Sequence, residues 1–232
     1  MTTVDGREGP TPARALYGRS RGKTLRDGQK RLLAEALPIF SIAPDDLAEG
    51  RVFPRTPQEV WLEIGFGAGE HLVERAKANP DVGVVGCEPF LNGIVAALAG
   101  LKREDISNVR LRHGDAQAVI EAAPDAFFSR VFVLYPDPWP KRRHHKRRLI
   151  AEGVIEALAR VMRKGAELRF ATDIDDYAGW TLARFLASPH FRWAGAQADD
   201  WRRPWPGWRP TRYEAKARSE SRGSVYLTFV RL

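Results

Sequence analysis

The stretch VWLEIGFGAGE, residues 60–70, is an apolar strand that runs directly into a glycine-rich turn and then into a helix. Glycine suits this turn because the backbone must bend sharply and approach a ligand closely, which a Cβ would block. The spacing Gly65-x-Gly67-x-Gly69 differs from the Gly-x-Gly-x-x-Gly pattern of dinucleotide sites. Glu70 also stands where a pyrophosphate would need a bare helix N-terminus, so a nucleoside ligand that carries no phosphate fits better.

Short β-type runs alternate with helical patterns along the rest of the chain, which is typical of βαβ units. The expected strands are residues 60–64, 82–87, 109–112, 131–135 and 167–171, and the expected helices are residues 69–78, 91–102, 146–161 and 175–187. Two further strands, 191–196 and 224–230, are joined by a connection in which no helix is expected, so we expect an antiparallel pair at the sheet edge. The pattern predicts an α/β fold: a Rossmann-like, doubly wound, mostly parallel sheet with an antiparallel C-terminal hairpin.

The N-terminal part of the chain differs in composition from the rest. We expect a basic arm over residues 1–36, mobile in the free protein, ahead of one domain over residues 37–232. An amphipathic segment, 27–37, predicts a short helix that Pro38 stops. The whole chain has 37 Lys+Arg against 29 Asp+Glu, a formal charge of +8, which is compatible with a polyanionic partner.

The single cysteine and the hydropathy pattern restrict the compartment and the chemistry. Cys87 closes an apolar run and is expected to be buried, which argues against a reaction that needs a cysteine thiolate. The longest apolar stretch, near residues 93–101, is far shorter than the ~20 residues of a membrane span. We therefore expect a cytoplasmic protein with no membrane association.

Acidic residues close three successive strands. Glu63 precedes the glycine turn, Glu88 ends the second strand and Asp115 follows the third. In this architecture the acid after the second strand accepts both hydroxyls of a ribose, and Asp115 could accept from an adenine amino group. Each acid alone could be a solvated loop residue or a helix cap. Together with the glycine turn, they favour S-adenosylmethionine over a nicotinamide cofactor.

The fourth strand ends in the loop Pro136-Asp137-Pro138-Trp139. In a doubly wound sheet this loop borders the reactive end of the ligand, so Asp137 is expected beside the methyl donor, and Trp139 offers a flat face for a base. Two kinds of target on a base are considered. If the methyl group goes to a ring nitrogen such as guanine N7, which carries a lone pair and no proton, Asp137 would orient the base rather than accept a proton. The loop also resembles the Asp-Pro-Pro-aromatic loop of enzymes that methylate base amino groups, and a plain turn residue is a further alternative.

A dense basic run follows this loop. Residues 141–148 hold six Lys/Arg in eight positions, which favours phosphate binding next to Asp137, although a solvated surface is the alternative. His144 and His145 lack further ligands at metal spacing, so no metal site is expected. Thr172-Asp173 ends the fifth expected strand. Asp173 either adds a carboxylate to the ligand site at the carboxyl ends of the strands or caps the helix that follows. The tryptophans and arginines of the connection 201–214 could stack RNA bases or cap the sheet edge.

From about Gly18 to the end, the chain resembles the bacterial tRNA (guanine-N7)-methyltransferases. The most specific pieces are EIGFGAG at 63–69, PDPWPKRRHHKRR at 136–148, Thr172-Asp173 and TRYEAK at 211–216. The motif GRSRG at 18–22 also looks like the arm of that family and is expected to order on tRNA.

The resemblance implies a class I methyltransferase fold and transfer of a methyl group from S-adenosylmethionine to guanine N7 in the variable loop of tRNA. The cofactor contacts that it implies are Glu63, Gly65, Gly67, Gly69, Glu88, Asp115 and Asp137, with Asp137 also catalytic. The implied base contacts are Lys141, Asp173, Thr211, Tyr213 and Glu214, and the implied RNA contacts are Arg143, His144, His145, Lys146, Arg147 and Arg148. An RNA base exocyclic-amino methyltransferase and a non-catalytic RNA-binding protein are the alternatives. We expect no obligatory protein partner and either a monomer or a homodimer.

Overall fold

The computed structural model describes residues 22–50 and 52–232, so Gly18 to Arg21 of the arm motif lie outside the described residues. The strands are β1 Glu59–Ile64, β2 Val82–Glu88, β3 Val109–His113, β4 Phe128–Leu134, β5 Met162–Thr172, β6 Phe191–Trp193 and β7 Val225–Arg231. The helices are α1 Asp27–Phe40, α2 Pro44–Ala48, α3 Glu70–Ala78, α4 Leu91–Arg103, α5 Gln117–Ala122, α6 Glu152–Val161, α7 Asp175–Ala187, α8 Asp199–Arg202 and α9 Arg212–Ser219. A 3₁₀ turn, η1, spans Arg142–Arg147.

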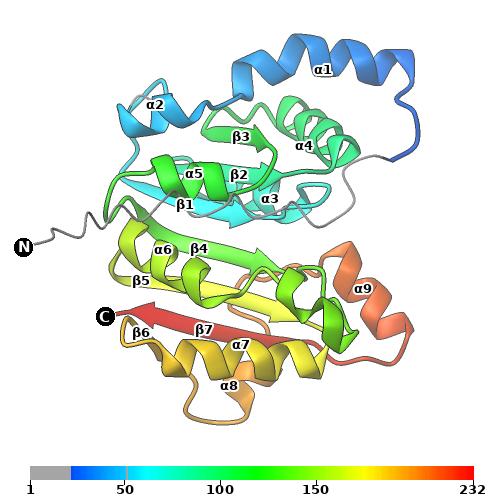
Figure 1. Cartoon of the computed structure of the whole chain (residues 1–232). Helices are drawn as coiled ribbons and strands as arrows, with labels where there is room; N and C mark the ends of the chain where they lie inside the picture. The colour runs from blue at the N-terminus through cyan, green and yellow to red at the C-terminus, as the bar shows by residue number, and fades with distance from the viewer. Residues whose placement is uncertain (1–21, 51) are drawn as a thin grey trace, which may run out of the picture.

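The strands form one sheet with the order β3-β2-β1-β4-β5-β7-β6 (Figure 1). β1 to β5 are parallel to one another, and β7 runs antiparallel between β5 and β6. The predicted fold class is therefore confirmed, including the antiparallel pair at the edge. The strand order reverses between β1 and β4, and ligands of such sheets bind outside the carboxyl ends of the strands at this reversal.

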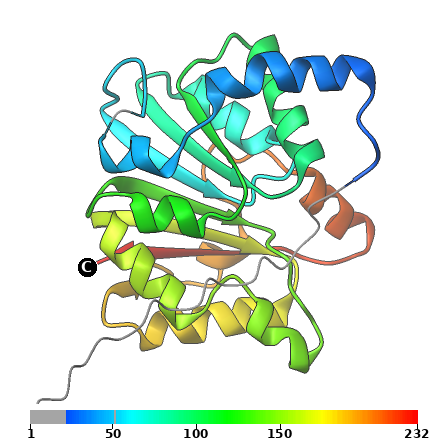
Figure 2. The same ribbon diagram turned by 45° about the horizontal axis from the view of Figure 1, so that its top comes forward.

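Alternate residues of the central strands supply two hydrophobic layers. Val131 and Val133 of β4 pack with α2, α5, α6 and α7, and Figure 2 shows α5, α6 and α7 across this face. Phe132 points to the opposite face. On that face α3 and α4 cover β2 and β3, and α1 packs on α4. The buried Cys87 belongs to the first layer, as predicted, and burial raises the pKa of its thiol.

The predicted helix 146–161 is wrong over its first third. Residues 142–147 form η1, and α6 begins at Glu152. The intervening chain is held away from a helical path by α7, because the Trp180 indole N–H donates to the Ile150 carbonyl at 2.8 Å. The prediction for residues 175–187, in contrast, is confirmed at both ends by α7.

The helix at the N-terminal end also continues further than predicted. α1 passes through Pro38 and ends at Phe40, and the Ser41 N–H donates to the Leu37 carbonyl at 2.7 Å. Pro38 removes only its own N–H from the helical hydrogen bonds, and the buried Phe40 stabilises the last turn against the core. The expected boundary between residues 36 and 37 falls inside α1.

The expectation of a connection with no helix between the last two strands is wrong. α8 and α9 both lie in it, although each is short. α9 begins at a side-chain cap, because the Thr211 hydroxyl accepts from the Glu214 N–H at 3.3 Å.

Candidate active site at the carboxyl ends of the strands

The glycine turn after β1 has a conformation that other residues rarely adopt. Gly65, Gly67 and Gly69 have φ angles of +73°, +61° and +81°. A Cβ at Gly93 of α4 would lie 2.1 Å from the Gly67 carbonyl oxygen, so the first turn of α4 is in direct contact with the loop. A Cβ at Gly65 would meet nothing within 4 Å, so this part of the turn borders open space.

Glu88 is held at the end of β2 by main-chain hydrogen bonds. Its Oε2 accepts from the Gly67 N–H at 2.7 Å, and its Oε1 accepts from the Phe90 N–H at 2.8 Å. Each carboxylate oxygen retains a second acceptor site, which matches the two hydroxyls of a ribose. The pKa of Glu88 is raised, chiefly because of burial, although the two backbone N–H groups act to lower it.

The other two acids that close strands are also held in place. Glu63 is buried, and its Oε2 lies 2.8 Å from Nδ1 of the buried His71. Asp115 accepts from the Gln117 N–H at 3.0 Å and so holds the start of α5. Next to Asp115, a Cβ at Gly114 would meet only the Arg112 Nε, at 3.7 Å. Acids at three strand ends, with open space at Gly65 and Gly114, suit the ribose, the adenine amino group and the cationic methyl donor of S-adenosylmethionine.

The loop after β4 holds Asp137 in a strained backbone. Tyr135 and Trp139 have φ angles of +51° and +44°, a region that costs a non-glycine residue roughly 1–3 kcal/mol. Asp137 lies exposed between them, yet the surrounding protein displaces enough water to raise the pKa of its carboxyl. The negative charge of Asp137 in turn raises the pKa of Glu88, so the two acids face one site.

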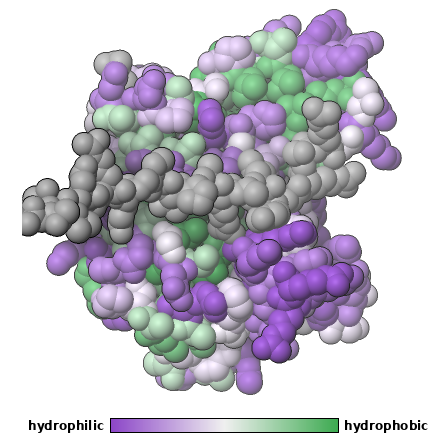
Figure 3. Space-filling model, in the orientation of Figure 1, coloured by the Kyte–Doolittle hydropathy of each residue, from purple (hydrophilic) through white to green (hydrophobic). Residues whose placement is uncertain are grey.

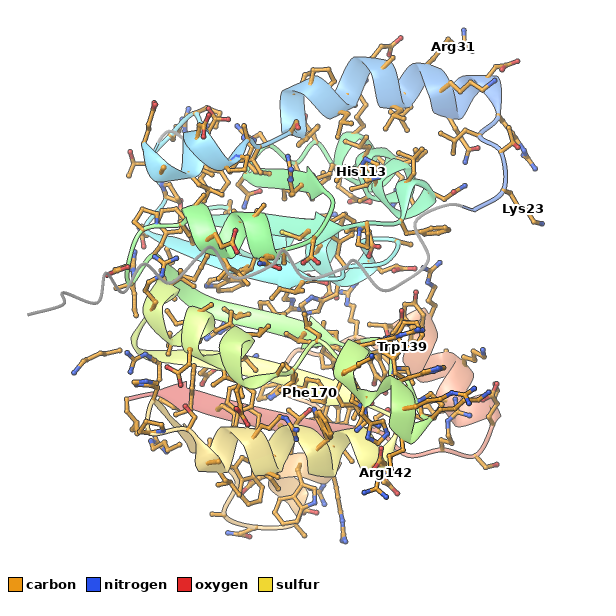
Figure 4. All side chains as sticks on the ribbon, viewed as in Figure 1. Lys23, Arg31, His113, Trp139, Arg142 and Phe170 are labelled. Atoms are coloured by element: carbon orange, nitrogen blue, oxygen red, sulfur yellow. The ribbon has the colours of Figure 1, made fainter. Side chains whose placement is uncertain are left out.

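Most of the basic run faces solvent beside this loop. Lys141, Arg143 and Lys146 are exposed, and the Arg147 guanidinium lies 4.9 Å from the centre of the Trp139 ring. Figure 4 labels Trp139 and Arg142 at the same end of the molecule as α9, and Figure 3 shows a strongly hydrophilic surface there. Partial burial and the neighbouring cations lower the pKa of His144, so lysines and arginines supply the positive charge.

The structure departs from the sequence-based expectation at Arg148 and His145. The Arg148 side chain is fully buried and packs on the rings of Tyr177 and Trp180, so it is not exposed to RNA in this conformation. The His145 ring packs edge-on against Trp180 at 5.3 Å and is largely buried. The reason is that η1 turns one side of the run toward α7. The sequence shows that these residues are basic, but it does not show which of their side chains point toward α7.

Asp173 lies at the end of β5, where it pairs with an arginine from a distant part of the chain. Its Oδ2 accepts from Arg222 Nε at 2.8 Å and forms an ion pair with Arg222 Nη2 at 2.7 Å. The cap of α7 is Ile174, which makes no side-chain capping bond, so Asp173 is not the helix cap. Arg222 was not predicted from the sequence, since an arginine between serine and glycine in a turn carries no signal of its own.

The predicted base-binding residues of α9 divide by exposure. Tyr213 is exposed, stacks with Tyr135 at 6.5 Å and approaches Gly67, where an added Cβ would lie 3.2 Å from its ring. Glu214 is fully buried, and its Oε2 accepts from the Trp208 indole N–H at 2.6 Å. Thr211 is buried as the cap of α9. Only Tyr213 of these three therefore presents its side chain at the surface.

The tryptophans of the connection pack on the sheet. Trp205 and Trp208 pack on the layer that contains Trp61 and Phe132, and the Trp205 indole N–H donates to Thr228 at 2.8 Å. Trp208 also lies 5.3 Å from the ring of His71. Of the two interpretations, the cap over the sheet agrees with this geometry. His71 was not predicted either, because a histidine on the apolar face of a helix gives no sequence signal.

Solved structures with the same fold include an rRNA methyltransferase. The chain is similar to the 16S rRNA (adenine(1408)-N(1))-methyltransferase from Catenulisporales acidiphilia, with a TM-score of 0.52 and 18% identity over 83% of this chain and 94% of that one. An rRNA methylase from Streptococcus thermophilus matches with a TM-score of 0.52 and 12% identity, over 82% of this chain and 93% of that one. The fold and the acids at the strand ends define a class I, S-adenosylmethionine-dependent methyltransferase.

Sequence relatives narrow the class. Residues 57–227 match the family described as putative methyltransferases. A tRNA (guanine-N(7)-)-methyltransferase of Azorhizobium caulinodans is 48% identical over 94% of this chain and 95% of its own length. One from Ruegeria sp. is 46% identical over 95% of this chain and 89% of its own. The chain belongs to the tRNA (guanine-N(7)-)-methyltransferase family.

Two kinds of feature are absent from residues 22–50 and 52–232. No helix in these ranges is long and apolar enough to span a membrane. Within the same ranges, no three His, Cys, Asp or Glu side chains are grouped as metal ligands.

Proposed function

We propose that this protein transfers a methyl group from S-adenosylmethionine to N7 of a guanine in the variable loop of tRNA. The observation that carries the proposal is the position of Asp137. It lies close enough to the buried Glu88 to raise that residue's pKa, and it is followed directly by the exposed cations of the basic run. A base delivered by phosphate contacts would therefore reach the loop that borders the cofactor site.

Methylation of guanine N7 requires correct positioning of the guanine more than it requires a proton acceptor. S-adenosylmethionine supplies an electrophilic methyl group, and N7 attacks with a lone pair that carries no proton. Asp137 would accept from the Watson–Crick edge of the guanine and stabilise the positive charge that develops on the ring. Trp139, beside Asp137, provides a ring face for the base.

The remaining site residues have separate proposed roles. Glu63, Glu88 and Asp115, with the glycine turn at 65–69, hold the cofactor. Lys141, Asp173 and Tyr213 hold the guanine, whereas the buried Thr211 and Glu214 support α9, which carries Tyr213. The RNA phosphates contact Arg143, His144, Lys146 and Arg147.

A second reaction, methylation of a base amino group, is favoured by one observation. The surrounding protein displaces water from the exposed Asp137 and raises the pKa of its carboxyl, which makes the carboxylate a better proton acceptor than an ordinary aspartate. This reaction needs a proton acceptor, because an exocyclic amino group loses a proton when it is methylated. The two reactions differ in the atom that receives the methyl group.

The deciding experiment is incubation with labelled S-adenosylmethionine and tRNA from a strain that lacks 7-methylguanine, followed by nucleoside analysis. Label in 7-methylguanosine supports the proposal. Label in an exocyclic N-methyl nucleoside would move the target atom, and cofactor binding with no transfer to tRNA would contradict the proposal.

We also propose a cytoplasmic enzyme that acts as a monomer or homodimer with no other protein. This proposal is supported by a site that one chain supplies, from the cofactor carboxylates to the basic run. Size-exclusion chromatography with light scattering, on the fraction that methylates tRNA, would identify the active species.

A further inference from the structure

The loop that carries Asp137 needs support from its surroundings. Tyr135 and Trp139, on either side of it, both have positive φ angles. Pro136 and Pro138 have no N–H group and cannot hold the loop by donating hydrogen bonds. A strained backbone of this kind persists only where neighbouring groups hold it.

The start of the loop is held by β5 and by the residue that precedes β7. The Tyr135 N–H donates to the Ala171 carbonyl of β5 at 2.8 Å, and the Tyr135 hydroxyl bonds to the Ser224 hydroxyl at 2.9 Å. These contacts precede Asp137 in the chain. They leave the backbone after Asp137 to be held by a different group.

Arg148 holds that second half. Its Nε donates to the Pro138 carbonyl at 2.9 Å, one residue after Asp137. Its Nη2 donates to Asp176 in the first turn of α7, and this bond lowers the pKa of Asp176 because it favours the carboxylate form. Arg148 thus joins the loop after β4 to the helix after β5.

The guanidinium of Arg148 is fixed by its packing as well as by its hydrogen bonds. The rings of Tyr177 and Trp180 both have centres 4.9 Å from its central carbon. Trp180 is itself bonded to the Ile150 carbonyl at 2.8 Å. A planar cation between aromatic rings, with donors that point in two directions, has little freedom to move.

We infer that Arg148 is a positioning residue for the reaction: it fixes the loop of Asp137 against α7 and does not contact RNA. The basic run therefore has two functions, since Lys141, Arg143 and Lys146 face outward. A lysine at position 148 cannot replace the arginine, because an ammonium group lacks the planar fork that serves Pro138, Asp176 and the two rings together.

The test compares Arg148→Lys with Arg143→Gln, which removes an outward-facing charge of the same run. Arg148→Lys should lower kcat at saturating tRNA and cofactor by about 10- to 100-fold, because small displacements of a reacting group have effects of this size. Its Kd for tRNA and the salt dependence of that Kd should match the wild type. Arg143→Gln should instead weaken tRNA binding and reduce its salt dependence.

A second variant covers failure of Arg148→Lys to fold. The Asp176 side chain is 65% exposed, so Asp176→Asn should fold, and it should lower kcat by less than Arg148→Lys with unchanged tRNA affinity. Weaker tRNA binding with a reduced salt dependence and unchanged kcat would show that Arg148 contacts RNA. A lower melting temperature of Arg148→Lys with wild-type kcat would show that Arg148 only stabilises the fold.

The inference rests on the proposed function, and hydrogen exchange separates the two. Amides of residues 139–148 should exchange faster in Arg148→Lys than in Arg143→Gln, whether or not tRNA is the substrate. Absence of methyl transfer by the wild type would contradict the proposed function alone. Unchanged exchange in Arg148→Lys would contradict the positioning role alone.

Discussion

Three acidic residues at the ends of neighbouring strands are each held by a different kind of partner. Glu63 contacts a histidine, Glu88 accepts from two main-chain N–H groups, and Asp115 accepts from the first residue of α5. Such contacts fix each carboxylate before a ligand arrives and reduce the ordering cost of binding. Asp137 differs, because its side chain is exposed at the mouth of the site.

Asp137→Ala should lower turnover by about 100- to 1,000-fold, the usual effect of removing a group that stabilises transition-state charge. Affinity for tRNA should change little, since most of it comes from phosphate contacts elsewhere. Single-turnover methyl transfer and a filter-binding assay would measure the two quantities. Near-normal turnover would remove Asp137 from the mechanism.

The raised pKa of Glu88 predicts that cofactor affinity depends on pH. As pH falls, Glu88 gains its proton at a higher pH than an ordinary glutamate, and the neutral acid is a weaker acceptor for ribose hydroxyls. Affinity for S-adenosylmethionine should therefore decrease as pH falls toward this raised value. The contribution of Glu88 to the free energy of unfolding changes in the opposite direction. It rises as pH falls, because protonation removes the cost of burying the charge.

Calorimetric titration of the cofactor between neutral and mildly acidic pH would check this prediction. Glu88→Gln cannot titrate at this position, so it should bind the cofactor more weakly at neutral pH and with a smaller pH dependence. A pH dependence equal to that of the wild type would assign the effect to another group, such as Asp137.

At the scale of elements, the site depends on the close approach of α4 to the glycine turn. Gly93 lies in the first turn of α4 and is buried against the Gly67 carbonyl. The two elements are separated by α3 and β2 in the chain, so this contact is made only when the sheet has formed. It places the turn beside Glu88, whose Cγ is also near the Gly93 position.

Gly93→Ala should lower the free energy of unfolding by ~1–3 kcal/mol, because the new methyl group would force α4 and the turn apart. Gly179→Ala is the matched control in α7, where a Cβ meets nothing within 4 Å, and it should stabilise the protein by about 0.5–1 kcal/mol. Urea denaturation would measure both. Equal effects of the two substitutions would contradict the close approach of α4 to the turn.

At the scale of the whole molecule, the C-terminal connection crosses the sheet and reaches the site. Trp205 and Trp208 cover β4, β5 and β7 on the face that α3 and α4 cover elsewhere. Arg75 of α3 donates to the Gly207 carbonyl at 2.8 Å, which fastens the connection to the first half of the sheet. The chain therefore returns Tyr213 to the glycine turn from the far end of the sequence.

The exposed cations of η1 should determine part of the salt dependence of tRNA binding. The double variant Arg143→Ala with Lys146→Ala should reduce the slope of log affinity for tRNA against log salt by up to about 0.9 for each phosphate that the protein no longer neutralises. Both side chains are exposed on η1, so the fold should be unaffected. Fluorescence titrations at several salt concentrations would measure the slope, and an unchanged slope would make the run an ordinary solvated surface.

The sequence by itself determined the parallel core of the sheet, the glycine turn and the acids at the strand ends. These features depend on local patterns: alternation of strands and helices, positive φ at glycine, and the rule that ligands bind at carboxyl ends. Only the tertiary structure decided that Arg148 faces inward, that Arg222 pairs with Asp173 and that Glu214 is buried. The physical reason is that burial and pairing of a charged side chain depend on segments distant in the chain, which no local pattern records.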